Sequence, residues 1–165
     1  MELTQKGISQ KDNWQAAGYD LPQLDIPAVT QKTLAAPEWI HFGAGNIFRA
    51  FQANVAQCLL NKGILHTGLI AAEGYDYEII EKMYRPHDNL GILVTLKSDG
   101  GMEKTVVGSI VESLILDSQD EAEYGRLKEI FCAPSLKMAS FTITEKGYQI
   151  RNMKGEFYPA VLDDF

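Results

Sequence analysis

Two glycines one residue apart stand in the segment 43–48, which reads GAGNIF. Their spacing matches the first two glycines of the dinucleotide fingerprint G-x-G-x-x-G, and a phenylalanine takes the place of the third. In that fingerprint the first glycine makes a tight strand-to-helix turn, and the second lets the backbone approach a diphosphate. Backbone N–H groups at the helix start then bind the phosphates, helped by the positive end of the helix dipole. The candidate cofactor-binding residues of this motif are Gly43, Ala44, Gly45, Asn46, Ile47 and Phe48.

Three charged residues stand where a dinucleotide makes polar contacts. Glu73 ends a predicted strand, and Asp76 follows three residues later. A carboxylate at this place accepts hydrogen bonds from the adenosine ribose and repels the extra phosphate of NADP, so NAD is the expected cofactor. Arg49, on the first turn of the predicted helix, is placed to screen the cofactor phosphates. The alternatives are a solvated loop acid for Glu73, a surface side chain for Arg49 and a ligand-free tight turn for the glycine pair.

These residues need a strand, a turn and a helix to bring them together. The apolar run 39–42 predicts a buried strand that ends at Gly43. A helix is predicted to begin at Asn46, its N-cap, with a stripe at three- and four-residue spacing. The stripe consists of Ile47, Phe48, Phe51, Val55, Cys58 and Leu59. A second strand at 68–72 completes a unit of about 30 residues, the size of a parallel βαβ unit.

The rest of the chain adds helices and strands around one hairpin. Periodicity and turn residues predict helices at 77–84 and 118–132, a strand at 138–144, and a hairpin of the runs 90–97 and 104–116. The expected fold is α/β, a Rossmann-like dinucleotide-binding domain with an inserted β-hairpin. We assign residues 1–37 to an extended N-terminal arm with short local structure, and residues 38–165 to the NAD(P)-binding domain.

Composition excludes several classes of function. The 165 residues carry a net charge of −7, whereas nucleic-acid binding needs a basic face. No apolar stretch reaches the roughly 18–20 residues of a membrane helix, and no signal peptide is recognised, so a cytoplasmic protein is expected. Two cysteines and three scattered histidines predict no metal site. His41, inside the predicted strand, is expected to be structural.

Two segments resemble a known family. Residues 39–53, WIHFGAGNIFRAFQA, are similar to the N-terminal signature of the mannitol dehydrogenase family, whose members typically read G-x-G-x-F-x-R-A-x-Q-A here. These long-chain polyol-specific dehydrogenases include the fructuronate (mannonate) and tagaturonate reductases. Residues 140–148, SFTITEKGY, look like the family's T-x-T-E-x-G-Y segment. The likeness spans residues 38–148.

The resemblance implies an NAD-dependent oxidoreductase that interconverts a secondary alcohol of a hexitol or aldonate and its ketone, of the mannitol/fructose or mannonate/fructuronate type. The substrate is then a small polyol or sugar acid, and Thr144 and Glu145 lie near the nicotinamide or the active-site cleft. Family members are much longer, with a catalytic lysine, asparagine and histidine in a helical C-terminal domain.

Nothing after Tyr148 matches that catalytic set, and Lys146 does not hold the family's catalytic position. We therefore expect an N-terminal portion that lacks the C-terminal catalytic domain, has no catalytic residue and is inactive by itself. A non-catalytic nucleotide-binding or sensor module remains the alternative, and a domain that binds S-adenosylmethionine is a weaker one.

Overall fold

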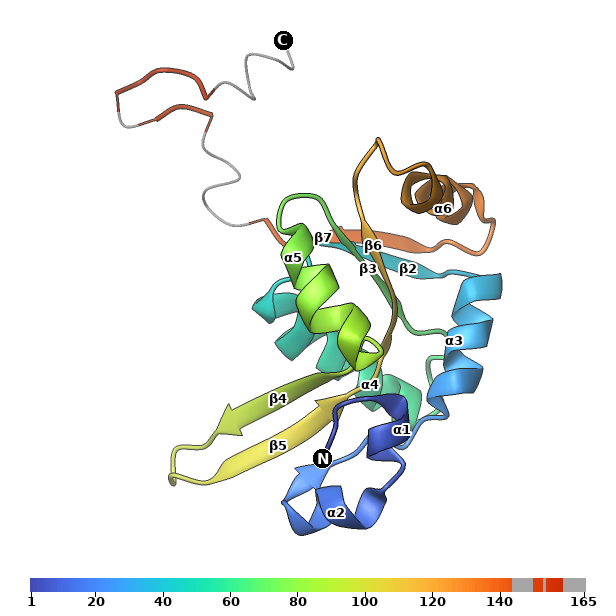
Figure 1. The fold of residues 1–165 in the computed structure, drawn as a ribbon, viewed down its shortest axis with the longest axis vertical. Coiled ribbons are helices and arrows are strands. Elements are labelled where there is room, and N and C mark those ends of the chain that lie inside the picture. Colours follow the sequence, from blue (N-terminus) through green and yellow to red (C-terminus); the bar gives the residue numbers. More distant parts are fainter. Residues whose placement is uncertain (144–149, 153, 159–165) are drawn as a thin grey trace.

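The computed structural model describes residues 1–143, 150–152 and 154–158, and its centre is a parallel four-stranded sheet (Figure 1). The strands of this sheet are β2 (Trp39–Phe42), β3 (Leu69–Glu73), β6 (Ile110–Ile115) and β7 (Met138–Phe141). Their order is β6-β3-β2-β7, and every neighbouring pair is parallel. The predicted α/β, Rossmann-like fold is therefore confirmed.

The strand order reverses direction beside β2. From β2 the chain builds outward on one side through β3 and β6, and then returns to place β7 on the other side of β2. In open α/β sheets, ligands bind outside the carboxyl ends of the strands at this kind of topological switch point. The carboxyl ends of β2 and β7 are therefore the place at which the fold predicts a ligand.

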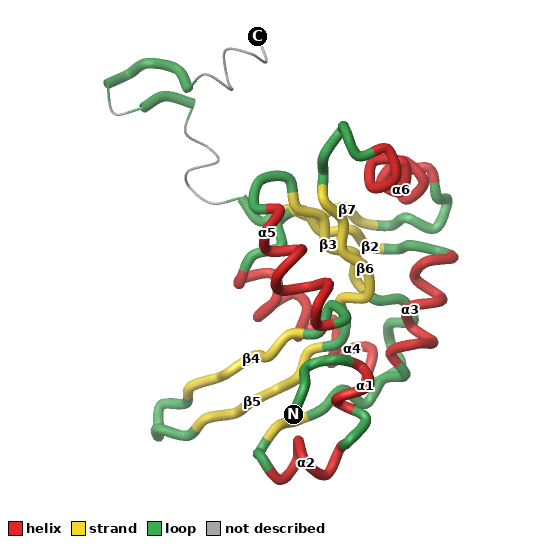
Figure 2. Tube along the Cα trace, in the orientation of Figure 1, coloured by secondary structure: helices red, strands yellow, loops and turns green. Residues whose placement is uncertain are grey.

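Helices cover both faces of the sheet (Figures 1 and 2). One face carries η1 (Phe48–Gln52), α4 (Ala53–Asn61), α5 (Tyr77–Ile79) and η2 (Ile80–Tyr84), and the other carries α6 (Glu121–Cys132). Side chains of β3 alternate between the two, because successive residues of a strand point to opposite faces. Leu69 and Ala71 pack in the first cluster, and Ile70 and Ala72 in the second.

The helix expected from Asn46 is present, but Phe48 is the only residue of its predicted apolar stripe that is fully buried. Ile47 is 62% exposed and Phe51 is 67% exposed, whereas Ala53 and Ala56 are buried against the sheet. After Asn46 and Ile47 the helix continues as the π-helical segment η1, whose i→i+5 hydrogen bonds place more residues in each turn than an α-helix does. A period of 3.6 residues therefore does not describe this stretch, and small residues take the position closest to the sheet.

The predicted hairpin is confirmed, but its second run is two strands. The hairpin consists of β4 (Gly91–Leu96) and β5 (Met102–Val107), which pair antiparallel in a second sheet. At Gly108 and Ser109 the chain leaves β5 and enters β6 of the main sheet. The Gly108 amide donates to Gln57 Oε1 of α4, and the Ser109 hydroxyl donates to the carbonyl of Ala53. These bonds to α4 hold the crossing between the sheets.

The N-terminal arm has short local structure, as predicted, but it is not extended throughout, because most of it is helical. It contains α1 (Gln5–Ile8), α2 (Lys11–Ala16), β1 (Tyr19–Asp20) and α3 (Ile26–Ala35). Trp14 of α2 is 3% exposed, and β1 adds a parallel edge to β5. Asp25 caps α3 by accepting from the Ala28 amide, and Pro27 stands in the first turn, where its missing N–H costs nothing. Proline therefore stands at the start of a helix here. The domain boundary at 37/38 stays a prediction.

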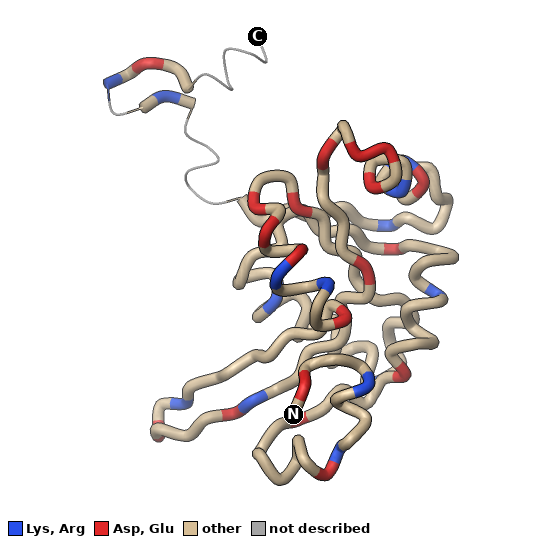
Figure 3. The backbone as a smooth tube through the Cα atoms, in the orientation of Figure 1, with Lys and Arg blue, Asp and Glu red and all other residues tan. Residues whose placement is uncertain are grey.

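Charged residues are dispersed over the fold. Lys and Arg are scattered along the tube among Asp and Glu, and no large basic region is seen in this view (Figure 3). Within the described residues, no helix is both long and apolar enough to cross a membrane. The short helix η3 (Arg85–His87), which contains Pro86, ends the segment of α5 and η2.

Candidate dinucleotide-binding site

The first glycine of the motif makes the turn that the fingerprint requires. Gly43 follows β2 directly and has a φ of +106°, a conformation that other residues rarely adopt. Its amide donates to the carbonyl of Ala72 on β3. A Cβ at this position would lie 3.1 Å from the carbonyl oxygen of Thr142, so the chain that follows β7 also leaves little room for a side chain. Glycine is therefore required at position 43 for the turn itself.

Ala44 is held by two other elements and is completely buried. Its amide donates to Glu73 Oε2 at 2.8 Å, and its carbonyl accepts from the Tyr84 hydroxyl at 2.9 Å. We call Gly43 and Ala44 the inner half of the turn. The Ala44 amide, which the sequence assigned to a diphosphate, is thus bound to a carboxylate in this structure.

The residues 45–47, which we call the outer half of the turn, are open. A Cβ on Gly45 would meet no atom within 4 Å, and both Asn46 and Ile47 are exposed. Their backbone N–H groups find no acceptor in the described part of the chain, as expected for the first turn of a helix. The Asn46 side chain accepts from Arg49 Nη2, so the predicted N-cap bond to a backbone N–H is wrong. Three amides at a helix start therefore remain available for an anion.

Phe48 lies in the core at the place of the third glycine. Its ring is fully buried and stacks on His41, with centroids 4.0 Å apart and planes 6° from parallel. The side chain consequently points to the sheet and leaves the outer half of the turn unobstructed. Phe48 packs between the turn and the sheet, and its buried ring is not accessible to a ligand.

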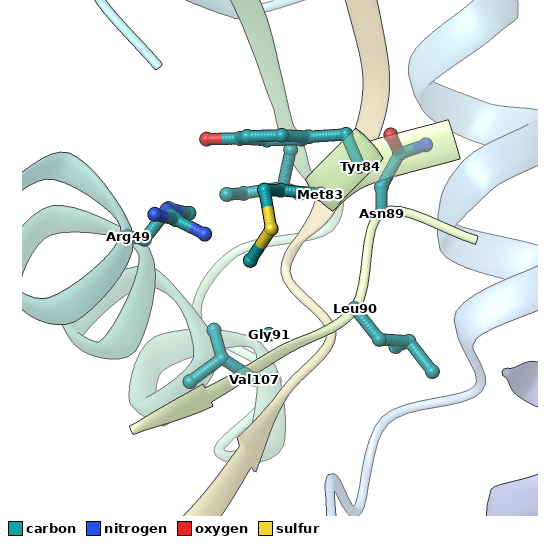
Figure 4. Close-up of a pocket in the computed structure, with 8 residues that line it drawn as sticks. Arg49, Met83, Tyr84, Asn89, Leu90, Gly91 and Val107 are labelled. Carbon is teal, nitrogen blue, oxygen red and sulfur yellow. The ribbon is translucent and has the colours of Figure 1, made fainter. Parts of the chain in front are cut away.

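Arg49 is bonded to Asn46 of the turn and lines a small cavity (Figure 4). Its guanidinium carbon is 5.8 Å from the Tyr84 ring centroid, and burial raises the pKa of the Tyr84 hydroxyl far above its usual range. The cavity, lined also by Met83 and Val107, measures about 10 Å³, which suits one water molecule and not a nucleotide. Arg49 is therefore half-buried beside the turn and is not the free surface side chain of the alternative interpretation.

Glu73 ends β3 as predicted, and it is only 8% exposed. Besides Ala44, its carboxylate accepts from the amides of Tyr75 at 3.0 Å and Asp76 at 3.4 Å. The alternative of a solvated loop acid is therefore wrong. Each carboxylate oxygen has two lone pairs, so Glu73 retains acceptor capacity for a ligand hydroxyl. The Asp76 side chain is exposed and makes no capping bond.

His41 is structural, as expected from the sequence. It is fully buried, and its ring nitrogens lie 2.8 Å from Ser140 Oγ and 2.8 Å from Thr142 Oγ1. Burial lowers the pKa of His41 to about 4. The predicted site residues Thr144 and Glu145 lie outside the described residues, so their placement stays a prediction.

Sequence reasoning missed Tyr84 and Thr142. Nothing in the sequence marks the contact of Tyr84 with the turn, which depends on how η2 packs. Thr142 was recognisable: it follows Ser140 at the two-residue period of a strand, and both share one face with the histidine before the glycine turn.

Comparisons with known proteins agree with the fold. A D-mannonate oxidoreductase of Thermotoga maritima is 44% identical over 164 residues, which cover 99% of this chain and 30% of the relative. A polyol:NADP oxidoreductase of Gluconobacter oxydans is 28% identical over 86% of this chain and 27% of its own length. The solved mannitol 2-dehydrogenase of Pseudomonas fluorescens, in a ternary complex with NAD and D-mannitol, is 26% identical with a TM-score of 0.72. That match covers 95% of this chain and 30% of the dehydrogenase.

No protein-family model matches the chain. The chain spans about 30% of the length of the D-mannonate oxidoreductase, and a similar share of the other relatives. The names of the relatives agree with the resemblance carried by residues 39–53 and 140–148. The chain belongs to the mannitol dehydrogenase family of oxidoreductases and corresponds to the N-terminal Rossmann portion of its longer members.

Proposed function

We propose that this chain is the NAD-binding portion of an oxidoreductase that interconverts a secondary alcohol of a hexitol or aldonate and its ketone. The observation that carries the proposal is the open outer half of the turn, at the carboxyl end of β2 beside the switch point. The backbone amides of residues 45–47 have no acceptor in the described chain and lie at the start of a helix. This is the arrangement that binds a diphosphate. The bound cofactor supplies the hydride chemistry, and this chain's residues hold and orient it.

The residues around the turn divide the binding between them. Gly45 leaves space for the backbone to approach a phosphate, because no atom lies where its side chain would be. Arg49 brings a positive charge to an otherwise acidic chain, and its Nη2 is already bound to Asn46 at the helix start. The backbone amides are therefore the main donors to the phosphates of a dinucleotide, and Arg49 adds one positive charge.

Glu73 supports NAD over NADP. Its carboxylate is fixed by three backbone amides at the end of β3, where the ribose of the adenosine half lies in this fold. Ribose hydroxyls donate to such a carboxylate, whereas a 2′-phosphate carries negative charge and is repelled. Because one relative is named for NADP and another was solved with NAD, this choice has to be measured on the chain itself.

The relatives support a polyol or sugar-acid substrate for the full-length protein. Mannonate/fructuronate is the pair we favour, since the D-mannonate oxidoreductase is the more similar of the two sequence relatives described above. The 165 residues carry no set that matches the family's catalytic lysine, asparagine and histidine. We therefore expect the chain by itself to bind NADH without oxidising it when fructuronate or fructose is added.

Calorimetric titration with NADH, NADPH and S-adenosylmethionine tests the proposal. We expect NADH to bind at least tenfold more tightly than NADPH, a difference of about 1.4 kcal/mol. Glu73→Gln removes the charge and keeps one oxygen, so it should narrow the preference for NADH over NADPH, although either Ala44 or the amides of Tyr75 and Asp76 lose their acceptor. Asp76→Asn, which alters an exposed side chain, is the matched control and should change the preference less. Preferential binding of S-adenosylmethionine, or no binding of either nicotinamide nucleotide, would refute the proposal.

A further inference from the structure

A chain of hydrogen bonds joins β2 to β7 beneath the glycine turn; the two strands lie side by side in Figure 1. Trp39 Nε1 lies 2.7 Å from Ser140 Oγ, and Ser140 Oγ lies 2.8 Å from His41 Nδ1. His41 Nε2 lies 2.8 Å from Thr142 Oγ1. None of these four side chains carries a formal charge. The direction of each hydrogen bond, from donor to acceptor, therefore depends on which atoms carry the protons.

The proton positions follow from the indole. Trp39 has an N–H and no acceptor, so Ser140 Oγ accepts from it. The hydroxyl proton of Ser140 then has His41 Nδ1 as its partner in the described residues, and the serine donates to that nitrogen. Since burial lowers the pKa of His41 to about 4, the ring is neutral at pH 7 and carries its proton on Nε2. His41 therefore donates to Thr142 Oγ1.

Thr142 consequently has a proton to give. Its oxygen accepts from His41, and no other described residue accepts from its hydroxyl. Thr142 is half-buried and follows β7 at the switch point, and its Cβ lies 3.6 Å from the place of a Cβ on Gly43. The hydroxyl is thus beside the turn, on the side of β2 away from β3 and Glu73.

We propose that the Thr142 hydroxyl donates a hydrogen bond to an acceptor oxygen in the nicotinamide half of the bound dinucleotide. Trp39, Ser140 and His41 act as positioning residues, because their one-way hydrogen-bond chain makes Thr142 an acceptor toward the protein and a donor toward the ligand. This inference rests on the proposed function. The assignment to the nicotinamide half follows from the strand order, which puts the adenosine-side carboxylate at the end of β3 and Thr142 just after β7, on opposite sides of β2.

Calorimetry on Thr142→Val and Thr142→Ser tests the donor. Valine keeps the shape but has no hydroxyl, so NADH should bind about tenfold more weakly, the cost of one hydrogen bond to a polar ligand. Serine keeps the hydroxyl and should restore affinity to within about threefold of wild type. AMP, which lacks the nicotinamide half, should bind all three proteins equally. Equal loss of AMP and NADH binding in Thr142→Val would move the contact to the adenosine side and refute the assignment.

The tautomer of His41, measured by ¹⁵N NMR of the imidazole, tests the positioning residues. Wild type should show a neutral ring with the proton on Nε2. Ser140→Ala removes the hydroxyl that donates to His41 Nδ1. The His41 ring should then populate both neutral tautomers, and the affinity for NADH should fall. Ser135→Ala is the matched control: its hydroxyl bonds the Pro37 carbonyl before β7 and should affect neither measurement. A wild-type ring protonated on Nδ1 would overturn the inference.

The outcomes separate the inference from the proposed function. If wild type binds NADH and Thr142→Val binds it equally, the inference fails and the proposed function stands. If wild type binds neither nicotinamide nucleotide, the proposed function fails, and the inference fails with it.

Discussion

The two halves of the glycine turn differ in what holds them. In the inner half, Gly43 packs against Thr142 and both polar groups of Ala44 are bonded to protein, one to Glu73 and one to Tyr84. In the outer half, which begins at Gly45, the amides have no described acceptor and the side chains are exposed. The same motif therefore contains a structural half and a half that is free for a ligand. The two should respond to mutation in opposite ways.

The largest expected effect is the difference between Gly43→Ala and Gly45→Ala. Alanine at 43 must adopt a φ of +106° with its Cβ 3.1 Å from a carbonyl oxygen, so we expect about 2–3 kcal/mol of destabilisation. Alanine at 45 meets nothing within 4 Å and should change stability by less than about 1 kcal/mol. Urea unfolding of the three proteins measures both. Similar losses at the two positions would remove the distinction between the halves.

Acid should destabilise the inner half through His41, which supports it from β2. The folded chain binds the His41 proton near pH 4 and the unfolded chain near 6.5, so stability is complete above this window and falls as pH is lowered through it. We expect this residue alone to remove about 2 kcal/mol between pH 7 and pH 5. Comparing the pH dependence of unfolding with that of His41→Gln isolates the contribution. An unchanged slope in the variant would contradict the lowered pKa.

A side chain in the outer half should reduce binding and leave the fold intact. Gly45→Val places two methyl groups where the backbone is proposed to approach a phosphate, so NADH should bind about tenfold or more weakly, a loss of at least ~1.4 kcal/mol. Thermal unfolding of the apo protein should stay close to wild type, because the position is open. Full NADH affinity in a folded Gly45→Val protein would place the ligand elsewhere.

Tyr84→Phe should give the smallest loss and should act on the inner half alone. The variant leaves the buried carbonyl of Ala44 without its donor, which costs about 1 kcal/mol of stability. NADH affinity should change less than in Gly45→Val, since Tyr84 contacts the turn from the protein side. Chemical denaturation and calorimetry on the same sample check the two statements. A larger effect on binding than on stability would assign Tyr84 to the ligand site.

Local patterns in the sequence predicted most of the architecture. The strand at 39–42, the glycine turn, the helix after it and the hairpin turn at 98–101 each depend on residue type and period within a few positions. The position of Glu73 at the end of β3 was predictable for the same reason. Each of these elements is determined by residues within the element itself.

The errors have tertiary causes. The buried face of the helix depends on its π-helical segment, and a 3.6-residue template does not contain that possibility. The bond from Glu73 to Ala44 joins residues 29 positions apart, so no local pattern predicts it. In the quoted family pattern the aromatic residue stands at the position of Ile47, which is exposed, whereas the buried aromatic here is Phe48. A motif match therefore located the glycine turn without predicting which of its backbone groups are free.

The most direct test of the account is an NADH titration followed by ¹⁵N–¹H NMR of the backbone amides. We expect the largest chemical-shift changes at the amides of Gly45, Asn46 and Ile47, and a small change at the Ala44 amide, which is already bonded to Glu73. Shifts that leave these three amides unchanged, or that are largest at Ala44, would contradict it.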